Sequence, residues 1–347
     1  INQVASPSDL DTFQKEFNLP SQKIATDIGK HVSDFICKIN PNSCAEANLD
    51  VQYIMAMAPG SPLTYWYDSN FQAPFEDWIE QVAADENPPL VNSISYGGPE
   101  PLMATSVLNA FNTEAMKLGV QGVSIFVSSG DDGVAGNGAR GNVSACGYMP
   151  SFPATSPYIT AVGATQGGPV GGEEVACSGA TGGTITTGGG FSTNYAQPDW
   201  QASAVATFLS RDSSAVPGFA SGRAYPDVAM AGFNYPTVIG GSTYLVSGTS
   251  ASAPVVAGMV TLVNSRLVEQ GKPPVGFINP TLYANNGAAF NDIVTGDNKC
   301  SAGGPDGATC CTQGFNAVEG WDAATGWGSI QFDKFSELFG VSTSVLV

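Results

Sequence analysis

The side chains able to do chemistry in this sequence are one serine, Ser250, and three carboxylic acids, Glu46, Asp50 and Asp131. Ser250 stands among small residues, directly before a helical apolar pattern that runs from Val255 to Leu267. A serine at that place can be a helix N-cap, which is worth about 1 kcal/mol. It can also be a nucleophile, held where the N–H groups of a helix start stabilise an oxyanion. The three acids help to decide whether Ser250 is a helix cap or a nucleophile.

Glu46 and Asp50 are four residues apart on a predicted helix over 45–57, so both project from one face. An acidic pair at this spacing is common on a solvated face. If the pair instead faces a cleft, repulsion favours a shared proton and separates the two pKa values. Such a pair can take a proton from a nucleophile below neutral pH, where a histidine base would be charged.

The sequence contains one histidine, His31, in a polar N-terminal segment that is typical of the surface. A Ser-His-Asp triad needs a histidine base, and histidine metal sites need two or three. The base for a nucleophilic serine would therefore be a carboxylate, unless His31 itself reaches Ser250.

Asp131 lies in the turn Ser129–Gly133, which follows a predicted apolar strand. An aspartate in such a turn usually binds backbone N–H groups. A desolvated, protonated aspartate could instead donate a hydrogen bond to an oxyanion.

Helices and strands alternate along the chain, with short connections. Helices are predicted over 8–17, 45–57, 75–84, 106–118 and 332–339, and strands over 63–67, 90–96, 123–128, 158–162, 226–229 and 243–246. Residues 18–43 give no clear pattern, 166–190 are typical of a loop or hairpin, and 289–328 of a long loop. This order predicts an α/β fold with a mostly parallel sheet covered by helices on both faces. Gly97 and Asp131 then follow strand ends at the carboxyl edge, where active groups gather.

The 347 residues are 43% hydrophobic and show no repeat or linker, so we treat 1–347 as one domain. A net charge of −18 argues against a nucleic-acid or anionic-membrane partner and suits an acidic environment. No apolar run approaches 18 residues, which argues against a membrane span. The chain starts at Ile1 and shows no signal peptide, so a processed product is expected.

Seven cysteines allow up to three bridges with one thiol left over, which suits an oxidising compartment. Cys37 and Cys44 close a short loop, and Cys300, Cys310 and Cys311 crowd a glycine-rich segment. Asn142 begins the one N-glycosylation sequon, which weakly supports secretion.

Several motifs together resemble the sedolisins, the serine-carboxyl peptidases, in family order from about residue 44 to 340. Besides Glu46, Asp50, the turn at Asp131 and the serine motif Ser247–Pro254, the matching stretches are Ser93–Gly97, Phe152–Pro157, Gly188–Ser192, Arg223–Val228 and Gly320–Gly328. The Arg223–Val228 stretch and the serine motif look most like the tripeptidyl-peptidase branch of fungi and animals.

The resemblance implies a subtilisin-like fold with Ser250 as nucleophile, Glu46 as general base and Asp50 as its orienting partner. Asp131 would be the oxyanion donor, together with the Ser250 backbone N–H. The resemblance carries no role over to Ser252 or Asp132. Substrate would lie along backbone edges that glycines leave accessible. The residues expected to line it are Tyr96, Gly97, Gly98, Ser129, Gly130, Gly188, Gly189 and Gly190.

The resemblance also implies one structural calcium ion near the C-terminus, within 289–328. Its ligands would be the carboxylates of Asp292 and Asp322 and the carbonyls of Ile293, Val318 and Gly320. Two aspartates in glycine-rich loops are otherwise common turn formers.

Residues 1–43 match the family poorly, and the family's stretch before the first strand is missing. That upstream piece is cleaved and lost, retained as another chain, or simply not included, which leaves the edge pairing of the first strand open.

The expected protein is a monomeric acid peptidase, secreted or held in an acidic compartment, and made with a propeptide. It acts on peptides or proteins as a tripeptidyl-peptidase or an endopeptidase. The rival hypotheses are a catalytically silent homologue that binds peptides or a missing N-terminal fragment, and an ordinary serine hydrolase that uses His31.

Overall fold

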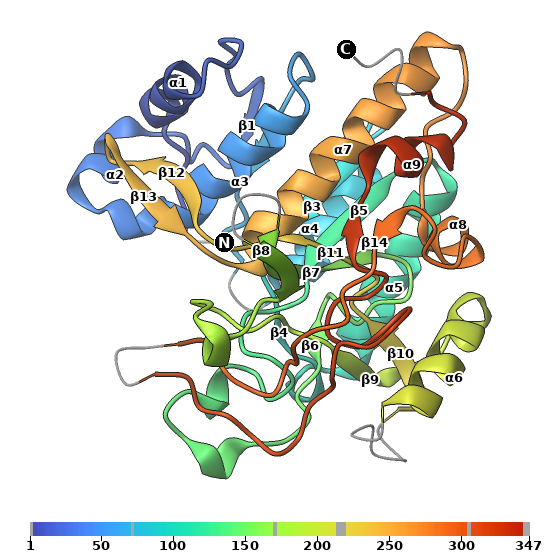
Figure 1. Ribbon diagram of the computed structural model, residues 1–347. Coiled ribbons are helices and arrows are strands. Elements are labelled where there is room, and N and C mark those ends of the chain that lie inside the picture. Colours follow the sequence, from blue (N-terminus) through green and yellow to red (C-terminus); the bar gives the residue numbers. More distant parts are fainter. Residues whose placement is uncertain (1–2, 71–72, 169–171, 213–219, 304–306, 343–347) are drawn as a thin grey trace.

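The computed structural model describes residues 3–70, 73–168, 172–212, 220–303 and 307–342, and Figure 1 shows their arrangement. Within this part of the chain the central sheet has seven strands, in the order β14-β15-β11-β7-β5-β3, with β8 paired to β7. The neighbours from β15 to β3 run parallel, and β14 and β8 are antiparallel to their partners. The predicted mostly parallel α/β sheet is therefore confirmed.

The strands of this sheet are β3 Val91–Ile94, β5 Ser124–Ser128, β7 Thr160–Gly168, β8 Gly172–Ala176, β11 Val228–Ala231, β14 Phe290–Asn291 and β15 Ser329–Ile330. Four two-stranded pairs lie outside it: β1 Thr26–Ile28 with β2 Thr64–Trp66, β4 Gly98–Pro99 with β6 Ser151–Phe152, β9 Gly190–Ala196 with β10 Gly222–Tyr225, and β12 Tyr235–Ile239 with β13 Ser242–Val246. The helices are α1 Pro7–Glu16, α2 Asp34–Ile39, α3 Ala45–Met57, α4 Pro74–Ala84, α5 Thr105–Val120, α6 Ala202–Arg211, α7 Thr249–Glu269, α8 Asn279–Ala284 and α9 Phe332–Glu337.

Strand β5 shows why helices cover both faces of the sheet. All five of its residues are buried, as expected for a central parallel strand. Phe126 packs in one core with Val256 and Val260 of α7. Ile125 and Val127 point the other way, into a second core with residues of α4 and α5. The alternation follows from the two-residue period of a strand.

Helix α7 begins earlier than the apolar pattern predicts. It starts at Thr249 rather than Val255, so Pro254 lies inside it. Proline has no N–H, so the carbonyl of Ser250, four residues earlier, loses its usual helical donor. The helix packs along β3, β5 and β7 and lies beside α3 (Figure 1).

Helix α7 is also long and apolar enough to cross a membrane by length and composition, although the sequence has no uninterrupted apolar run of 18 residues. In the fold, 72% of its most apolar window is buried inside the protein. Its apolar residues therefore serve the core.

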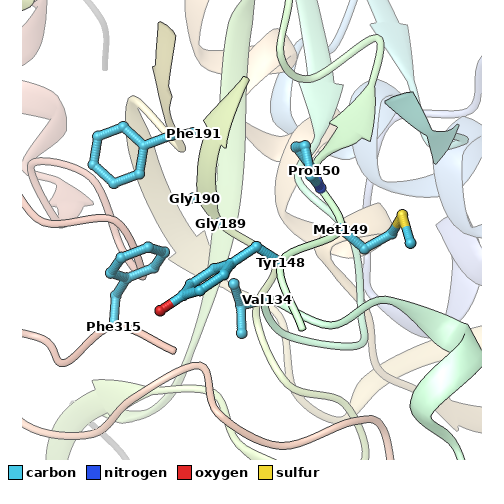
Figure 2. Close-up of a pocket in the computed structure, with 8 residues that line it drawn as sticks. All are labelled: Val134, Tyr148, Met149, Pro150, Gly189, Gly190, Phe191 and Phe315. Carbon is cyan, nitrogen blue, oxygen red and sulfur yellow. The ribbon is translucent and has the colours of Figure 1, made fainter. Parts of the chain in front are cut away.

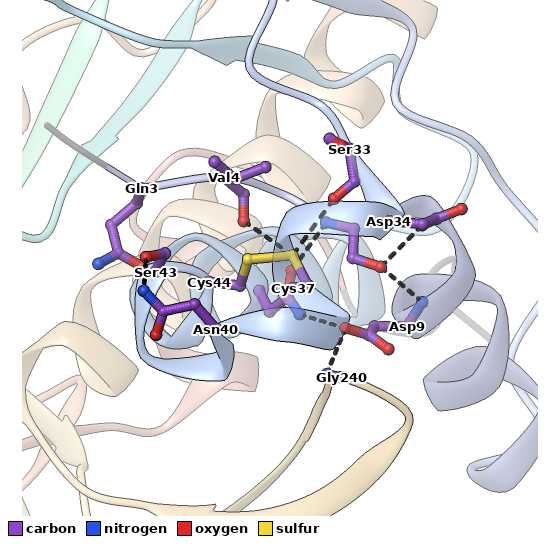
Figure 3. The surroundings of a disulfide bond; sticks show 12 residues. Gln3, Val4, Asp9, Ser33, Asp34, Cys37, Asn40, Ser43, Cys44 and Gly240 are labelled. Atoms are coloured by element: carbon purple, nitrogen blue, oxygen red, sulfur yellow. Dashed lines mark hydrogen bonds between the residues drawn. A yellow bond between two sulfur atoms is a disulfide. The ribbon is translucent and has the colours of Figure 1, made fainter.

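The segment without a clear pattern, 18–43, contains β1 and α2. A disulfide joins Cys37 of α2 to Cys44, which is the N-cap of α3, and Figure 3 shows its surroundings. The bridge therefore anchors the start of the helix that carries Glu46 and Asp50. Two further bridges join Cys146 to Cys311 and Cys300 to Cys310, and Cys177 is a buried free thiol.

The other strand predictions differ mainly at their limits. The strand predicted over 158–162 is β7, which runs on to Gly168 and turns back as β8, so the 166–190 segment contains a hairpin. Around 226–229, one strand ends at Tyr225 and the next begins at Val228. The loop at 289–328 holds β14 as its one regular strand among the described residues.

Candidate active site

Ser250 is the second residue of α7 and is 9% exposed. The N-cap is Gly248, whose φ is 170° and which makes no side-chain cap. The interpretation of Ser250 as a helix cap is therefore wrong, because the residue lies two positions beyond the N-cap, inside the first turn of the helix. Its hydroxyl donates to the carbonyl oxygen of Ser95 at 3.4 Å, a long contact that leaves Oγ available.

Ser95 connects the serine to the acidic pair. It lies just beyond β3, and its hydroxyl donates to Asp50 Oδ1 at 2.6 Å. The same hydroxyl lies 3.4 Å from the Ser250 carbonyl oxygen, which Pro254 leaves without a helical donor. Ser95 was included in a motif but given no role; its place at a strand end was the available signal.

Glu46 and Asp50 lie on α3; the Glu46 side chain contacts the Ser250 side chain, and Asp50 is connected to the serine through Ser95. Burial raises the pKa of Glu46 well above its usual range, repulsion from Asp50 raises it further, and the Ser250 side chain lowers it in part. Burial raises the pKa of Asp50 to about 7, although the hydrogen bond from Ser95 lowers it. Glu46 Oε1 is buried and accepts no hydrogen bond from the described residues. The two acids thus favour a shared proton over two charges.

Asp131 reaches the start of α7 from the end of β5. Its Oδ1 accepts hydrogen bonds from Thr249 N at 2.8 Å and from Thr249 Oγ1 at 2.9 Å. Asp131 Oδ2 and Ser250 N both lie close to Gly248. A Cβ atom built on Gly248 would be 3.2 Å from Asp131 Oδ2 and 3.4 Å from Ser250 N. Burial raises the pKa of Asp131, and the two bonds from Thr249 lower it in part. A carboxyl group and a helix N–H therefore border the same space beside Ser250.

An ion pair holds the turn that carries Asp131. Asp132 is buried and forms a bidentate pair with Arg140, at 2.6 and 2.8 Å. Asp132 Oδ1 also accepts from Ala302 N at 2.9 Å. The Asp131 carbonyl accepts from Thr186 N at 2.9 Å, so the turn is fixed from both sides. The sequence provided no signal for Arg140, because it lies eight residues away in an exposed loop.

The glycines expected to line the substrate fall into two groups. Tyr96, Gly97 and Gly98 are partly or fully exposed, whereas Gly188, Gly189 and Gly190 are buried. Gly188 N donates to Gly130 O at 2.7 Å, and a Cβ on Gly188 would lie 2.3 Å from Ser129 O. In this structure Gly188 therefore serves the close packing of two backbone segments. Figure 2 shows a small hollow beside Gly189 and Gly190, bordered by the rings of Tyr148, Phe191 and Phe315.

Three other side chains lie away from this chemistry. His31 stacks on the Tyr67 ring at 3.3 Å and its Nδ1 lies 2.9 Å from Gly29 O. Ser252 Oγ donates to two backbone carbonyls of β11. Asn142 is exposed and caps a short turn by accepting from Ser144 N.

The residues expected to bind calcium meet at one turn. Gly320 N donates to Asp292 Oδ2 at 2.7 Å, and Val318 N donates to Asp322 Oδ2 at 3.1 Å. The carbonyl oxygens of Ile293, Val318 and Gly320 accept none of the hydrogen bonds found among the described residues. Two carboxylates and three unused carbonyls form a hard-oxygen donor set of the kind calcium binds. No cluster of three or more His, Cys, Asp or Glu side chains occurs in the described part, so an ion here depends on backbone oxygens.

Comparison with known proteins gives consistent matches. Residues 64–275 match the model of the Subtilase family. Tripeptidyl-peptidase 1 of Dictyostelium discoideum is 32% identical over 96% of this chain and 52% of its own length. Its namesake in Rattus norvegicus is 37% identical over 83% of this chain and 50% of its own length. This chain thus spans about half the length of these relatives.

Among solved structures, a Pseudomonas sedolisin, a serine-carboxyl proteinase complexed with two molecules of pseudo-iodotyrostatin, superposes with a TM-score of 0.74. The match covers 96% of this chain and 90% of the sedolisin, at 25% identity.

Proposed function

Because the chain belongs to the subtilase family, and within it to the sedolisin or serine-carboxyl type of peptidase, we propose that it hydrolyses peptide bonds through an acyl-enzyme on Ser250. The observation that carries the proposal is the placement of Glu46 and Asp50 beside Ser250, with His31 in contact with Tyr67 and Gly29 instead. A carboxylate base is the only one that this site offers among the described residues.

In the first step the Ser250 oxygen forms a bond to the peptide carbonyl carbon while its proton passes to Glu46. The C–N bond then breaks, and Glu46 gives the proton to the leaving amine. Water repeats the sequence on the ester, which releases the acid and restores Ser250. Asp50 shares the proton of Glu46, and Ser95 holds Asp50 in place.

The neutral carboxyl group of Asp131 donates a hydrogen bond to the oxyanion, and Ser250 N donates a second. A protonated acid is suited to this task because its site is low in water, which raises its pKa. The preferred conditions are therefore acidic. At high pH Asp131 becomes an anion and repels the oxyanion that it would otherwise stabilise.

We assign the substrate as an extended peptide, bound along the exposed edge at Tyr96, Gly97 and Gly98 and beside Ser129 and Gly130. Gly188, Gly189 and Gly190 extend this site on the other side of Gly130, and Gly188 packs against the backbone of Ser129 and Gly130. The relatives named tripeptidyl-peptidase 1 favour release of tripeptides from the N-terminus over internal cleavage. We also propose that the protein is made with a propeptide, acts as a monomer and carries a glycan on Asn142. We propose that it is secreted or delivered to an acidic compartment, and the three disulfides support this secretory route.

A calcium ion would be held by Asp292, Asp322 and the carbonyls of Ile293, Val318 and Gly320. The ion would supply charge that fixes the turn at 318–322 and would take no part in the cleavage. Its effect would be on stability, because a ligand that binds only the folded state stabilises that state.

The test is product analysis by mass spectrometry, with an unblocked 15-residue peptide incubated at pH 4. Tripeptides lost in succession from the N-terminus support the exopeptidase, and internal fragments support the endopeptidase. An N-acetylated copy of the peptide is the matched control, because a tripeptidyl-peptidase needs the free amine. If neither peptide is cut, and a peptide aldehyde forms no adduct with Ser250, the peptidase proposal is wrong.

A further inference from the structure

Helix α3 carries two pairs of polar side chains on opposite faces. Glu46 and Asp50 form the acidic pair, and Glu46 contacts the Ser250 side chain. Asn48 and Gln52 are also four residues apart, and each lies two residues after one of the acids. Two residues of a helix correspond to a rotation of about 200°, so the amides point away from the acids. Both amide side chains are buried, with 2% and 1% of their surface exposed.

The amide pair binds the outer edge of the hairpin formed by β12 and β13. Among the described strands, β12 pairs with β13 alone. On the other edge of β12, Val238 N donates to Gln52 Oε1 at 3.0 Å, and Gln52 Nε2 donates to Val238 O at 2.8 Å. Asn48 Nδ2 donates to the same carbonyl oxygen at 3.0 Å. An amide side chain has the donor and the acceptor of a peptide group, so Gln52 takes the place of a neighbouring strand.

The turn of the hairpin is bound to Asn48 through Asp9 of α1. The Asp9 carboxylate accepts from Gly240 N and Gly241 N, both at 2.8 Å, and Figure 3 shows the bond to Gly240. It also accepts from Asn48 Nδ2 at 2.9 Å, while Asn48 Oδ1 accepts from Ser6 N at 2.9 Å. Hydrogen bonds are directional, whereas apolar burial is not. These contacts therefore fix how far α3 is rotated about its own axis.

The hairpin leads directly into the nucleophile. It lies beside α3 and α1 (Figure 1), and β13 ends at Val246. Only residues 247–249 then separate the strand from Ser250. Tyr53 Oη provides a further bond from α3 to β12, because it donates to Pro236 O at 2.8 Å. The helix that carries the base is thus bound to the strand pair that precedes the nucleophile.

We propose that Gln52 is a positioning residue of the peptidase, with Asn48 as its support. Its two bonds to Val238 set the rotation of α3, and so the approach of Glu46 to Ser250. The inference rests on the proposed acyl-enzyme chemistry and adds a residue that touches neither the substrate nor the reacting atoms. Because Glu46 reaches out from the helix axis, a small rotation of α3 moves its carboxyl group farther than the backbone. A misplacement of about 1 Å can cost about 10²-fold in rate.

Gln52→Met tests the proposal, because methionine fills a similar space and makes neither bond. We expect kcat/KM at pH 4 to fall by about tenfold or more. The affinity for a peptide whose scissile amide is reduced to CH2–NH should stay unchanged, because the substrate edge at 96–98 is not altered. The solvent deuterium isotope effect on kcat/KM should increase, because proton transfer from Ser250 to Glu46 then forms a larger part of the barrier. A smaller folded fraction would lower the rate and leave the isotope effect as it is.

Gln52→Glu provides the rescue. Burial raises the pKa of a carboxyl group, so at pH 4 this side chain is protonated and offers one donor and one acceptor in the shape of the amide. It should restore most of the activity that methionine removes.

Two controls separate position from stability. Thr243→Val breaks the 3.0 Å bond between the same hairpin and Glu16 of α1, leaves the bonds of α3 intact, and should keep the parental kcat/KM. Leu282→Ala on α8 removes buried apolar volume from the large core. It should lower the melting temperature and keep kcat/KM per folded enzyme.

Tyr53→Phe is a milder variant, which removes one bond to β12 and should lower kcat/KM by about threefold. Parental kcat/KM in both Gln52→Met and Tyr53→Phe would overturn the proposal. A loss in Gln52→Met that Gln52→Glu does not restore, with an unchanged isotope effect, would overturn it as well. If the parent chain cuts no peptide and forms no aldehyde adduct, the proposed function fails together with this inference. An active parent with fully active variants refutes this inference alone.

Discussion

Asp131 and Thr249 are joined by two hydrogen bonds to one carboxylate oxygen, from the backbone N–H of Thr249 at 2.8 Å and from its hydroxyl at 2.9 Å. Thr249 immediately precedes Ser250, so the acid at the end of β5 is positioned relative to the start of α7. The Thr249 hydroxyl also accepts from Gly130 N at 3.1 Å. One threonine thus holds both the acid and the turn that carries it.

Removing that hydroxyl should weaken catalysis without abolishing it. Thr249→Val keeps the shape and the backbone N–H but loses both hydrogen bonds of the hydroxyl, the one to Asp131 and the one from Gly130 N. Together they are worth about 2 kcal/mol, or about 30-fold in kcat/KM. Thr249→Ser is the matched control and should retain most of the activity. Steady-state kinetics at pH 4 measures both variants. A loss of kcat/KM in Thr249→Ser as large as that in Thr249→Val would contradict a specific role of the hydroxyl.

Ser250→Ala should remove the nucleophile and leave the fold intact. We expect kcat to fall by about 10⁶-fold, the scale of losing the nucleophile of a serine peptidase. Ser252→Ala is the matched control, because Ser252 bonds to β11 instead of facing the acids. Turnover that persists in purified Ser250→Ala would show that another group attacks the peptide.

Asp131→Asn should keep part of the activity, because an amide N–H still donates to the oxyanion. Asp131→Ala loses the donor and should be lower by about 10²-fold or more, as when one oxyanion donor is removed. The asparagine form should also extend activity toward neutral pH, since its amide does not ionise. Rates from pH 3 to 8 distinguish the variants; equal, complete loss in both would assign Asp131 a different role.

Burial of the three acids predicts weaker stability near neutral pH. The pKa values of Glu46, Asp50 and Asp131 are raised in the fold, so each contributes stability that is fully present below its unfolded pKa, near 4. That contribution is lost as pH rises through the folded pKa, which for Asp50 is about 7. The melting temperature of Ser250→Ala, which cannot digest itself, should fall from pH 4 to pH 8. A flat profile over that range would mean that these carboxyl groups are not buried in neutral form.

Arg140 should set the alkaline limit of activity through the turn it holds. Arg140 lowers the pKa of Asp131 by its charge, and it neutralises Asp132, which raises that pKa. Arg140→Met should therefore move the alkaline limb of the rate profile to higher pH and lower kcat/KM by about fivefold as the turn loosens. Lys117→Met, which breaks an exposed ion pair on α5, is the control and should leave the profile unchanged. An unchanged alkaline limb in Arg140→Met would rule out this coupling.

Calcium should stabilise the C-terminal turn without entering the reaction. At 100 times its Kd, an ion bound only to the folded state adds about 2.7 kcal/mol. EGTA should lower the melting temperature of the parent chain, and Asp292→Asn should reduce that difference. Asp333→Asn on α9 is the matched control. Equal melting temperatures with calcium and with EGTA would exclude the site.

Sequence patterns located the helices well where one apolar face repeats. The 45–57 pattern matches α3, and the 106–118 pattern lies within α5, because each helix buries one face, α3 against α7 and α1, and α5 against β5 and α4. The start of α7 was missed, because Pro254 and a run of small residues hide a helix whose first turn is fixed by contacts far away in the chain. Asp131 is one such contact.

Spacing and family resemblance predicted the acids of the candidate site, whereas neither predicted the residues that hold them in place. Ser95 and Arg140 act through partners that only the fold brings near, Asp50 and Asp132.

The packing of α3 against α7 has a mechanical consequence. Glu46 and Asp50 lie on α3, and Tyr53, Ile54 and Met57 of the same helix pack against the large core that contains α7. Ser250 is the second residue of α7. The base and the nucleophile are thus carried by two helices in direct contact, so a substitution that shifts one helix along the other changes the proton-transfer distance before it unfolds either helix.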